Sequence, residues 1–210
     1  MGTQFILRAM VCAAVLLGTG TAWGQAEPEF SAERGFYSEA FSLTLSIADT
    51  AGTIRYTLDS STPSSTAGTV YTNPIPISGT SIVRAIAIYS DGTLSAVATH
   101  TYLFVADVVT QCPTGTAPNS SWPAANNSNA SGQLINYGMD PDVVDDATYS
   151  DLIDDALLAL PSISVATDLS NLFNKTTGIY MNPKQDGSDW ERPASIELIY
   201  PSGKDGFQIN

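Results

Sequence analysis

Strand-forming residues fill the stretch Thr53-Ile54-Arg55-Tyr56-Thr57-Leu58-Asp59, which decides the predicted fold. Ile54, Tyr56 and Leu58 alternate with polar residues, and this period of two is typical of a β-strand with one buried face. The polar run from Asp59 to Pro63 follows directly and predicts a turn. The stretch is therefore predicted to be one short strand of an antiparallel sheet.

Similar runs lie on both sides of this stretch. Upstream, the apolar residues of 41–47 alternate with polar ones, and further strand-like runs cover 82–89 and 96–104. Asp91-Gly92 predicts a tight hairpin turn because both central positions tolerate positive φ. Six or seven short strands within about seventy residues predict a mainly β protein built on an immunoglobulin-like antiparallel β-sandwich.

The first residues predict a signal peptide over 1–24. Arg8 supplies a charge, Met10 to Leu17 form a short apolar core, and Ala22-Trp23-Gly24 places small residues where a signal peptidase reads. We expect cleavage after Gly24, with loss of Cys12, and export to the periplasm, the cell surface or the extracellular space. A Glu-rich lead-in over 25–34 follows.

The exported chain is then expected to keep one cysteine, Cys112. An unpaired thiol is unusual in an oxidising compartment, so two readings stay open: a partner beyond Asn210, or an inert, half-buried thiol. A reactive nucleophile is disfavoured because the single histidine, His100, sits in a strand pattern.

The charge balance limits the partners. Eight Lys and Arg against 21 Asp and Glu give a formal net charge of −13. Such a surface repels phosphate backbones and anionic lipid, which argues against nucleic-acid binding. After the signal peptide, no stretch reaches the roughly 18 apolar residues of a membrane span.

The composition changes after the sandwich. Residues 105–137 are rich in Pro, Gly, Asn and Ser, which predicts a linker or an irregular loop, with Trp122 docking it onto a neighbour. Residues 138–210 predict an incomplete α+β segment, with an amphipathic helix over 146–160 and a capped turn over 168–173. Its strands are expected over 162–166 and 194–200, and 207–210 begin another, so we expect the front end of a longer protein.

A first family resemblance covers about 35–104. The sandwich resembles the C-terminal type of β-sandwich found in chitobiase and β-hexosaminidase, which usually has Gly where this chain has Ser60. The resemblance implies an accessory module of secreted multidomain proteins rather than a sugar-cleaving domain. The matching motifs are Gly35-Phe36-Tyr37, Thr53 to Asp59, Ser61-Thr62-Pro63, Tyr71-Thr72-Asn73-Pro74-Ile75, Arg84-Ala85-Ile86-Ala87 and Thr101-Tyr102.

A second resemblance covers about 138–210, which is similar to the beginning of a CotH-type, protein-kinase-like domain. It implies that a longer parent protein transfers phosphoryl groups with ATP and magnesium. Lys175, Lys184 and Lys204 sit in turn-like segments, so the active site is expected beyond Asn210. The matching motifs are Tyr137 to Pro141, Leu160 to Ser164, Leu172-Phe173, Thr177 to Tyr180, Trp190 to Ala194 and Gly206 to Ile209.

No residue of this chain is predicted to be catalytic, cofactor-binding or metal-binding. Asp59 and Asp91 are interpreted as turn formers rather than paired acids for glycoside hydrolysis. The aspartates of 140–155 lack the ligand spacing of a helix-loop-helix calcium loop.

Two sets of aromatic residues have a binding and a packing interpretation. For Trp190 to Pro193, local packing and hydrogen bonding are favoured over a surface for a peptide or sugar. Core packing is likewise favoured over a sugar-stacking platform for Tyr37, Tyr56, Tyr71, Tyr89 and Tyr102.

The sequence therefore predicts a non-catalytic N-terminal portion of a secreted or cell-surface protein. In this reading the sandwich is a spacer or an interaction module, with cell-wall polysaccharide or other exported proteins as expected partners. One alternative is an appendage of a kinase-like enzyme whose active site lies beyond residue 210. The other alternative is a carbohydrate-binding module.

Overall fold

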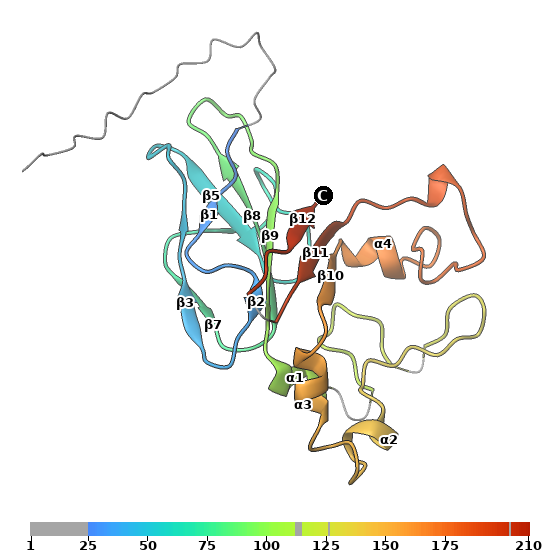
Figure 1. Ribbon diagram of the computed structural model, residues 1–210. Coiled ribbons are helices and arrows are strands. Elements are labelled where there is room, and N and C mark those ends of the chain that lie inside the picture. Colours follow the sequence, from blue (N-terminus) through green and yellow to red (C-terminus); the bar gives the residue numbers. More distant parts are fainter. Residues whose placement is uncertain (1–24, 112–114, 126, 202) are drawn as a thin grey trace, which may run out of the picture.

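A computed structural model describes residues 25–111, 115–125, 127–201 and 203–210. The predicted signal peptide, Cys12 and Cys112 lie outside the described residues. The chain is mainly β, as predicted: a β-sandwich is followed by short helices and a smaller sheet (Figure 1).

One layer of the sandwich is a five-stranded sheet with the order β2-β9-β8-β5-β6. β5, β6, β8 and β9 pair antiparallel, whereas β2 pairs parallel with β9. β2 therefore departs from the predicted all-antiparallel arrangement. The strands are β2 (Gly35–Phe36), β9 (Ala98–Leu103), β8 (Ser81–Ile88), β5 (Thr53–Thr57) and β6 (Thr69–Val70).

The facing layer consists of two strand pairs. β1 (Glu29–Phe30) pairs with β4 (Leu45–Ser46), and β3 (Phe41–Leu43) pairs with β7 (Ile75–Ile77). The run predicted as one strand over 41–47 is therefore split at Thr44, whose N–H donates to Ser31 Oγ and whose carbonyl accepts from Ser31 N–H. β1 falls in the predicted lead-in, so the sandwich begins before residue 35.

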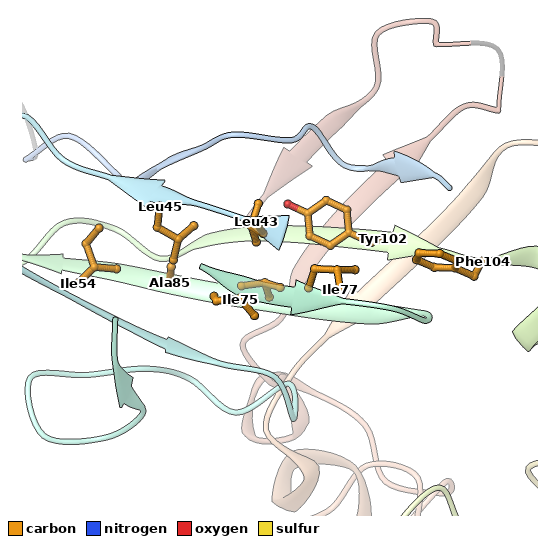
Figure 2. Packing of buried hydrophobic residues seen from close by; sticks show 9 residues of the cluster. Leu43, Leu45, Ile54, Ile75, Ile77, Ala85, Tyr102 and Phe104 are labelled. Carbon is orange, nitrogen blue, oxygen red and sulfur yellow. The ribbon is translucent and has the colours of Figure 1, made fainter. Parts of the chain in front are cut away.

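Alternate side chains of the two layers meet in one apolar core. Figure 2 shows Leu43, Leu45 and Ile77 from one layer lying close to Ala85 and Tyr102 from the other. Burial of this apolar area is the main stabilising contribution to the module. Its buried members are Leu43, Leu45, Ile54, Ile75, Ile77, Val83, Ala85, Tyr102 and Phe104.

The end of one strand and the geometry of one turn differ from their sequence predictions. β5 ends at Thr57, so Leu58 lies outside the strand and is 51% exposed. The hairpin at Asp91-Gly92 forms, but only Gly92 has positive φ, and Tyr89 N–H bonds to Thr93 carbonyl across a three-residue loop. A type I turn followed by one left-handed residue explains this geometry.

The predicted helix over 146–160 is wrong in extent. Helical structure covers α2 (Pro141–Val144) and α3 (Ile153–Leu158), with turns between them. Leu152 is 58% exposed and finds no core to pack on. Because short helices gain most of their stability from packing, the apolar periodicity alone does not sustain the longer helix.

The segment that begins at residue 105 opens with α1 (Val105–Thr110) and continues as irregular chain. Trp122 docks this chain, as predicted, because its ring centroid lies 5.6 Å from that of Tyr137 and 5.5 Å from that of Phe173. Phe173 belongs to α4 (Leu169–Phe173), and a short 3-10 helix, η1, follows at Ser188–Trp190.

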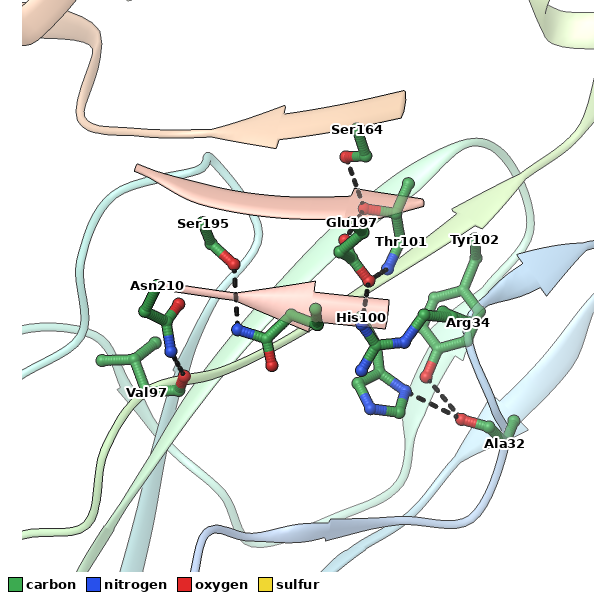
Figure 3. A network of polar contacts seen from close by, with 11 residues as sticks. Ala32, Arg34, Val97, His100, Thr101, Tyr102, Ser164, Ser195, Glu197 and Asn210 are labelled. Carbon is green, nitrogen blue, oxygen red and sulfur yellow. Dashed lines mark hydrogen bonds and ion pairs between the residues drawn. The ribbon is translucent and has the colours of Figure 1, made fainter. Parts of the chain in front are cut away.

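A third sheet has the order β10-β11-β12 and is fully antiparallel. β10 (Ser162–Ala166), β11 (Ser195–Ile199) and β12 (Phe207–Ile209) confirm the three strands expected in this part of the sequence. The register places six apolar side chains on one face of this sheet, with Ile163 69% and Phe207 49% exposed. Its opposite face lies against the sandwich (Figures 1 and 3).

In the part of the chain that the structure describes, no helix is both long and apolar enough to cross a membrane.

Candidate functional site at the joint between the sandwich and the third sheet

The two loop aspartates of the sandwich bond to their own turns, as predicted. Asp59 Oδ1 accepts from Ser61 N–H at 3.1 Å, and Asp91 Oδ1 accepts from Thr93 N–H at 2.9 Å. Hydrogen bonds from the Thr93 hydroxyl and N–H hold the pKa of Asp91 below its usual value. These carboxylates serve as acceptors for local backbone groups, which is a structural role.

The sandwich tyrosines do not gather into one sugar-stacking platform. Tyr102 is fully buried in the core, and burial raises its pKa. Tyr37 packs against Phe41 at 4.6 Å between ring centroids, and Tyr56 packs edge-on against Tyr71 at 6.4 Å. These contacts agree with the preference for packing over a common binding surface.

The Trp190 segment is held by local contacts. The Arg192 guanidinium lies 5.4 Å from the centre of the Trp190 ring, and Arg192 Nε donates to the carbonyl of Thr177 at 3.1 Å. Among the described residues, no group of three or more His, Cys, Asp and Glu side chains is placed to hold a metal ion. The aspartates of α2 and α3 therefore form no such group.

The two sheets meet at a polar joint that the sequence analysis did not identify. The outer face of the five-stranded sheet carries five buried side chains: Thr57, Arg84, Ile86, Thr99 and Thr101. The third sheet covers this face at Thr101, and the sandwich's own loop at residues 60–61 accepts hydrogen bonds from Thr57 and Arg84. The sandwich therefore buries apolar side chains on one side of β8 and β9 and mostly polar ones on the other.

Glu197 of β11 is the centre of this joint. Its carboxylate accepts from Thr101 N–H at 3.2 Å and from the Thr101 hydroxyl, which also lies 2.7 Å from Ser164 Oγ (Figure 3). Arg34 Nη1 lies 3.3 Å from Glu197 Oε1. This ion pair lacks hydrogen-bond geometry, so Arg34 Nη1 is a buried atom without a hydrogen-bond partner among the described residues.

A second polar contact lies beside the first. The Asp168 carboxylate accepts from Thr62 N–H at 2.6 Å, and Arg84 Nη1 donates to Thr62 Oγ1 at 3.0 Å. Asp168 was expected to cap α4, but its side chain makes no cap hydrogen bond. The Asp168 carboxylate bonds to Thr62 instead, so the prediction that Asp168 caps this turn is wrong.

Burial shifts the pKa values of the ionisable groups around the joint. Burial raises the pKa of Glu197, opposed by the Thr101 hydrogen bonds and by Arg34. Burial, and to a smaller extent the charge of Arg34, lowers the pKa of His100 to about 4. The hydrogen bond with the Ala32 carbonyl acts in the opposite direction. Burial also lowers the pKa of Arg84, opposed by Asp168. His100 is therefore neutral near pH 7.

An open cleft of about 810 Å³ adjoins this joint. One wall is Glu33 to Tyr37, which includes β2, and the other comes from β11, β12 and the turn between them. Lys204 lies in this turn, with its Nζ 4.6 Å from the centre of the Tyr200 ring. The cleft lies where the sandwich and the third sheet meet, and a junction between units is a common place for ligands.

Sequence reasoning missed Glu197, Thr101 and Asp168. One residue could have identified the joint from the sequence. Glu197 is a charged residue that stands between the apolar Ile196 and Leu198 in a predicted strand. Ser162, Ser164 and Ser195 extend this polar alternation. The pattern predicts a sheet with one polar face, but it does not say which face is covered.

Residues 43–102 match the protein-family model described as Fn3 associated. This part of the chain is therefore similar to a fibronectin-III-associated type of β-sandwich domain. The match covers the sandwich and less than half of the chain. A comparison with curated proteins finds no match. The resemblances to the chitobiase type of sandwich and to CotH stay predictions.

Proposed function

We propose that this chain is the non-catalytic N-terminal portion of a secreted or cell-surface multidomain protein. In this proposal the sandwich is a rigid spacer that orients the unit built on β10, β11 and β12. The observation that carries it is the polar joint, in which Glu197 and Asp168 of the second unit bond to Thr101 and Thr62 of the sandwich. Directional bonds between two units fix their orientation.

The burial pattern supports a spacer. Thr99 and Thr101 of β9 are 0% and 2% exposed because the third sheet covers them. A sandwich that offered this face to partners would leave it in water. The Fn3-associated match agrees with a module that stands next to other domains.

Distances between spin labels test the rigidity. Labels at Thr66→Cys and Gln185→Cys, with Cys12 and Cys112 changed to Ser, report on the two units. We expect one narrow distance distribution, and a broader one in Thr101→Val. Thr99→Val is the matched control, because Thr99 Oγ1 is buried but has no hydrogen-bond partner among the described residues. A broad distribution in the parent protein would contradict a rigid spacer.

Two further measurements test the remaining parts of the proposal. Incubation with labelled ATP and magnesium is expected to leave the protein and added protein substrates unlabelled, and incorporation would contradict a non-catalytic chain. Cell fractionation with N-terminal sequencing is expected to find an exported protein that begins at Gln25. An intracellular protein that retains Met1 would contradict export.

The kinase-like parent is the second candidate, and the apolar face of the third sheet favours it. Ile163, Val165 and Phe207 are each about half exposed or more. A sheet face of this kind usually packs against further structure of its own domain. A longer natural chain that binds ATP with magnesium and labels a substrate would support this candidate, and one that does neither would remove it.

A further inference from the structure

The outer face of the third sheet carries an inference that does not depend on the spacer role. The strand register places six apolar side chains on this face, which is turned away from the sandwich. Glu197 and Ser164 belong to the opposite face, where they contact Thr101. The six side chains of the outer face are Ile163, Val165, Ile196, Leu198, Phe207 and Ile209.

Much of this apolar face is in contact with water. Ile163 is 69%, Val165 56%, Ile209 55% and Phe207 49% exposed, while the two side chains of the central strand β11 are partly buried. Taking roughly 200 Å² for a fully exposed large residue, the face presents about 500 Å² of apolar surface. A contiguous patch of this size is near the upper end of what monomeric proteins expose and often marks an interaction site.

The face also lacks charge. None of its six side chains ionises, and the run 160–167, which contains β10, has no charged residue in a chain with 21 acidic and eight basic ones. β10 is an edge strand of its sheet, and edge strands that stay in water are commonly protected by charged side chains. The face therefore offers nothing to attract a charged partner, and the surface that fits it is equally apolar and uncharged.

We propose that this face packs on the same face of a second copy of the chain, in a two-fold symmetric dimer. In such a dimer both copies present the same patch, so an apolar, uncharged sheet face is matched by itself. Face-to-face packing buries about 1,000 Å² in the two copies together, which is the size at which specific interfaces begin. The interface is small, so the dissociation constant is expected in the micromolar range.

The acidic charge of the chain opposes this contact and gives it a recognisable salt dependence. Each copy has a formal net charge of −13, so two copies repel each other. Raising the salt concentration from about 0.1 M to about 1 M shortens the screening length from about 10 Å to about 3 Å. Dimerisation is therefore expected to strengthen at least about threefold, whereas a contact held by ion pairs weakens.

Sedimentation equilibrium of the complete chain over a range of concentrations tests the proposal. We expect a monomer–dimer equilibrium, with concentration-dependent shifts of the backbone NMR signals of residues 163–165 and 207–209. Ile163→Glu and Val165→Glu place a carboxylate in the apolar contact and are expected to weaken dimerisation at least about a hundredfold. Leu134→Glu is the matched control, because it adds the same charge at a 60% exposed apolar residue outside the third sheet. Its dimerisation is expected to stay unchanged.

A monomer at every concentration would overturn the proposal and leave the face to further structure of a longer natural chain. Equal weakening in Leu134→Glu, unchanged association in both Ile163→Glu and Val165→Glu, or association that weakens with salt would also overturn it. Growth beyond the dimer would do the same, because a two-fold contact closes after two copies.

Two further points keep the test decisive. If a variant unfolds in a thermal melt, the NMR signals of the unaltered chain decide, and concentration-dependent shifts confined to other elements overturn the proposal. The spacer role is measured separately by the spin-label distances, so a monomeric chain with a narrow distance distribution would remove the dimer and leave the spacer intact.

Discussion

The two faces of the five-stranded sheet are held by different forces. Towards β3, β4 and β7 the sheet buries apolar side chains such as Val83 and Tyr102. Towards β10, β11 and β12 it buries Arg84, Thr99 and Thr101. Apolar burial is strong but not directional, whereas a buried polar contact contributes little net stability and is costly when broken. The first face therefore makes the module fold, and the second sets the orientation of its neighbour.

Truncation of the apolar face is expected to have the largest effect. Leu43 is 0% exposed in the core, so Leu43→Ala removes buried methyl groups and leaves a cavity. We expect the free energy of unfolding to fall by about 4 kcal/mol, measured by urea denaturation. Leu134→Ala is the control, since Leu134 is 60% exposed, and it should change stability little. An equal loss of stability in the two variants would contradict the difference between a core side chain and a surface side chain.

The polar face should respond differently to single and double changes. Glu197→Leu leaves the Arg34 guanidinium beside the joint without its anion and is expected to cost about 3 kcal/mol. Arg34→Met combined with Glu197→Leu is expected to recover most of that loss, because no unpaired charge remains. Urea denaturation of both proteins checks this, with the exposed Glu191→Leu as control. A double variant as unstable as the single one would mean that the pair itself is strongly stabilising.

Acid should weaken the protein through His100, which stacks on Phe30 at 4.1 Å between ring centroids. The folded-state pKa of about 4 lies below the ordinary 6.5, so the unfolded chain binds the proton first. This contribution to stability is complete above pH 6.5 and is lost as the pH falls towards 4. We expect a loss of about 2 kcal/mol across that window.

A comparison with His100→Gln isolates this titration, because the chain contains one histidine. The variant should lose less stability than the parent between pH 6.5 and 4. The raised pKa of Glu197 acts in the opposite direction and is common to both proteins, so it cancels in the difference. Parallel curves of unfolding free energy against pH would show that His100 does not titrate differently on folding.

The smallest effect is expected at the turn after β5. Ser60 has a φ of 66°, in the left-handed region that favours glycine. Ser60→Gly should therefore raise the free energy of unfolding by about 0.5 kcal/mol after the entropy of the added glycine is included. Thermal melts measure the change. Ser65→Gly, at a neighbouring loop position without positive φ, should be neutral or destabilising, and the same gain at both sites would argue against relief of strain.

The sequence predicted the parts of the fold that depend on local alternation. The strands around Ile54, Val83 and Tyr102 follow from a period of two with turn residues between the runs. The break at Thr44 was not predictable, because it depends on Ser31 bonding from another segment. The helix over 146–160 was predicted too long, because periodicity does not reveal whether Leu152 has anything to pack on.

The candidate site was less accessible to sequence reasoning. The cleft and the joint combine residues about a hundred positions apart or more, such as Arg34 with Glu197 and Thr62 with Asp168. Each of these residues has an ordinary local role when read alone: Asp168 looks like a helix cap and Thr62 like part of a turn. Only the packing of the third sheet on the sandwich brings them together.

The parallel pair of β2 and β9 has a mechanical consequence. Gly35 and Phe36 pair with Tyr102 and Leu103, and Tyr37 N–H extends the ladder to the carbonyl of Leu103. After β1 has joined the facing layer, the chain enters the five-stranded sheet through the start of β2 and leaves it through the end of β9. A pull along the polypeptide therefore slides these two strands in opposite directions and loads their hydrogen bonds together, in shear, instead of unzipping them one at a time.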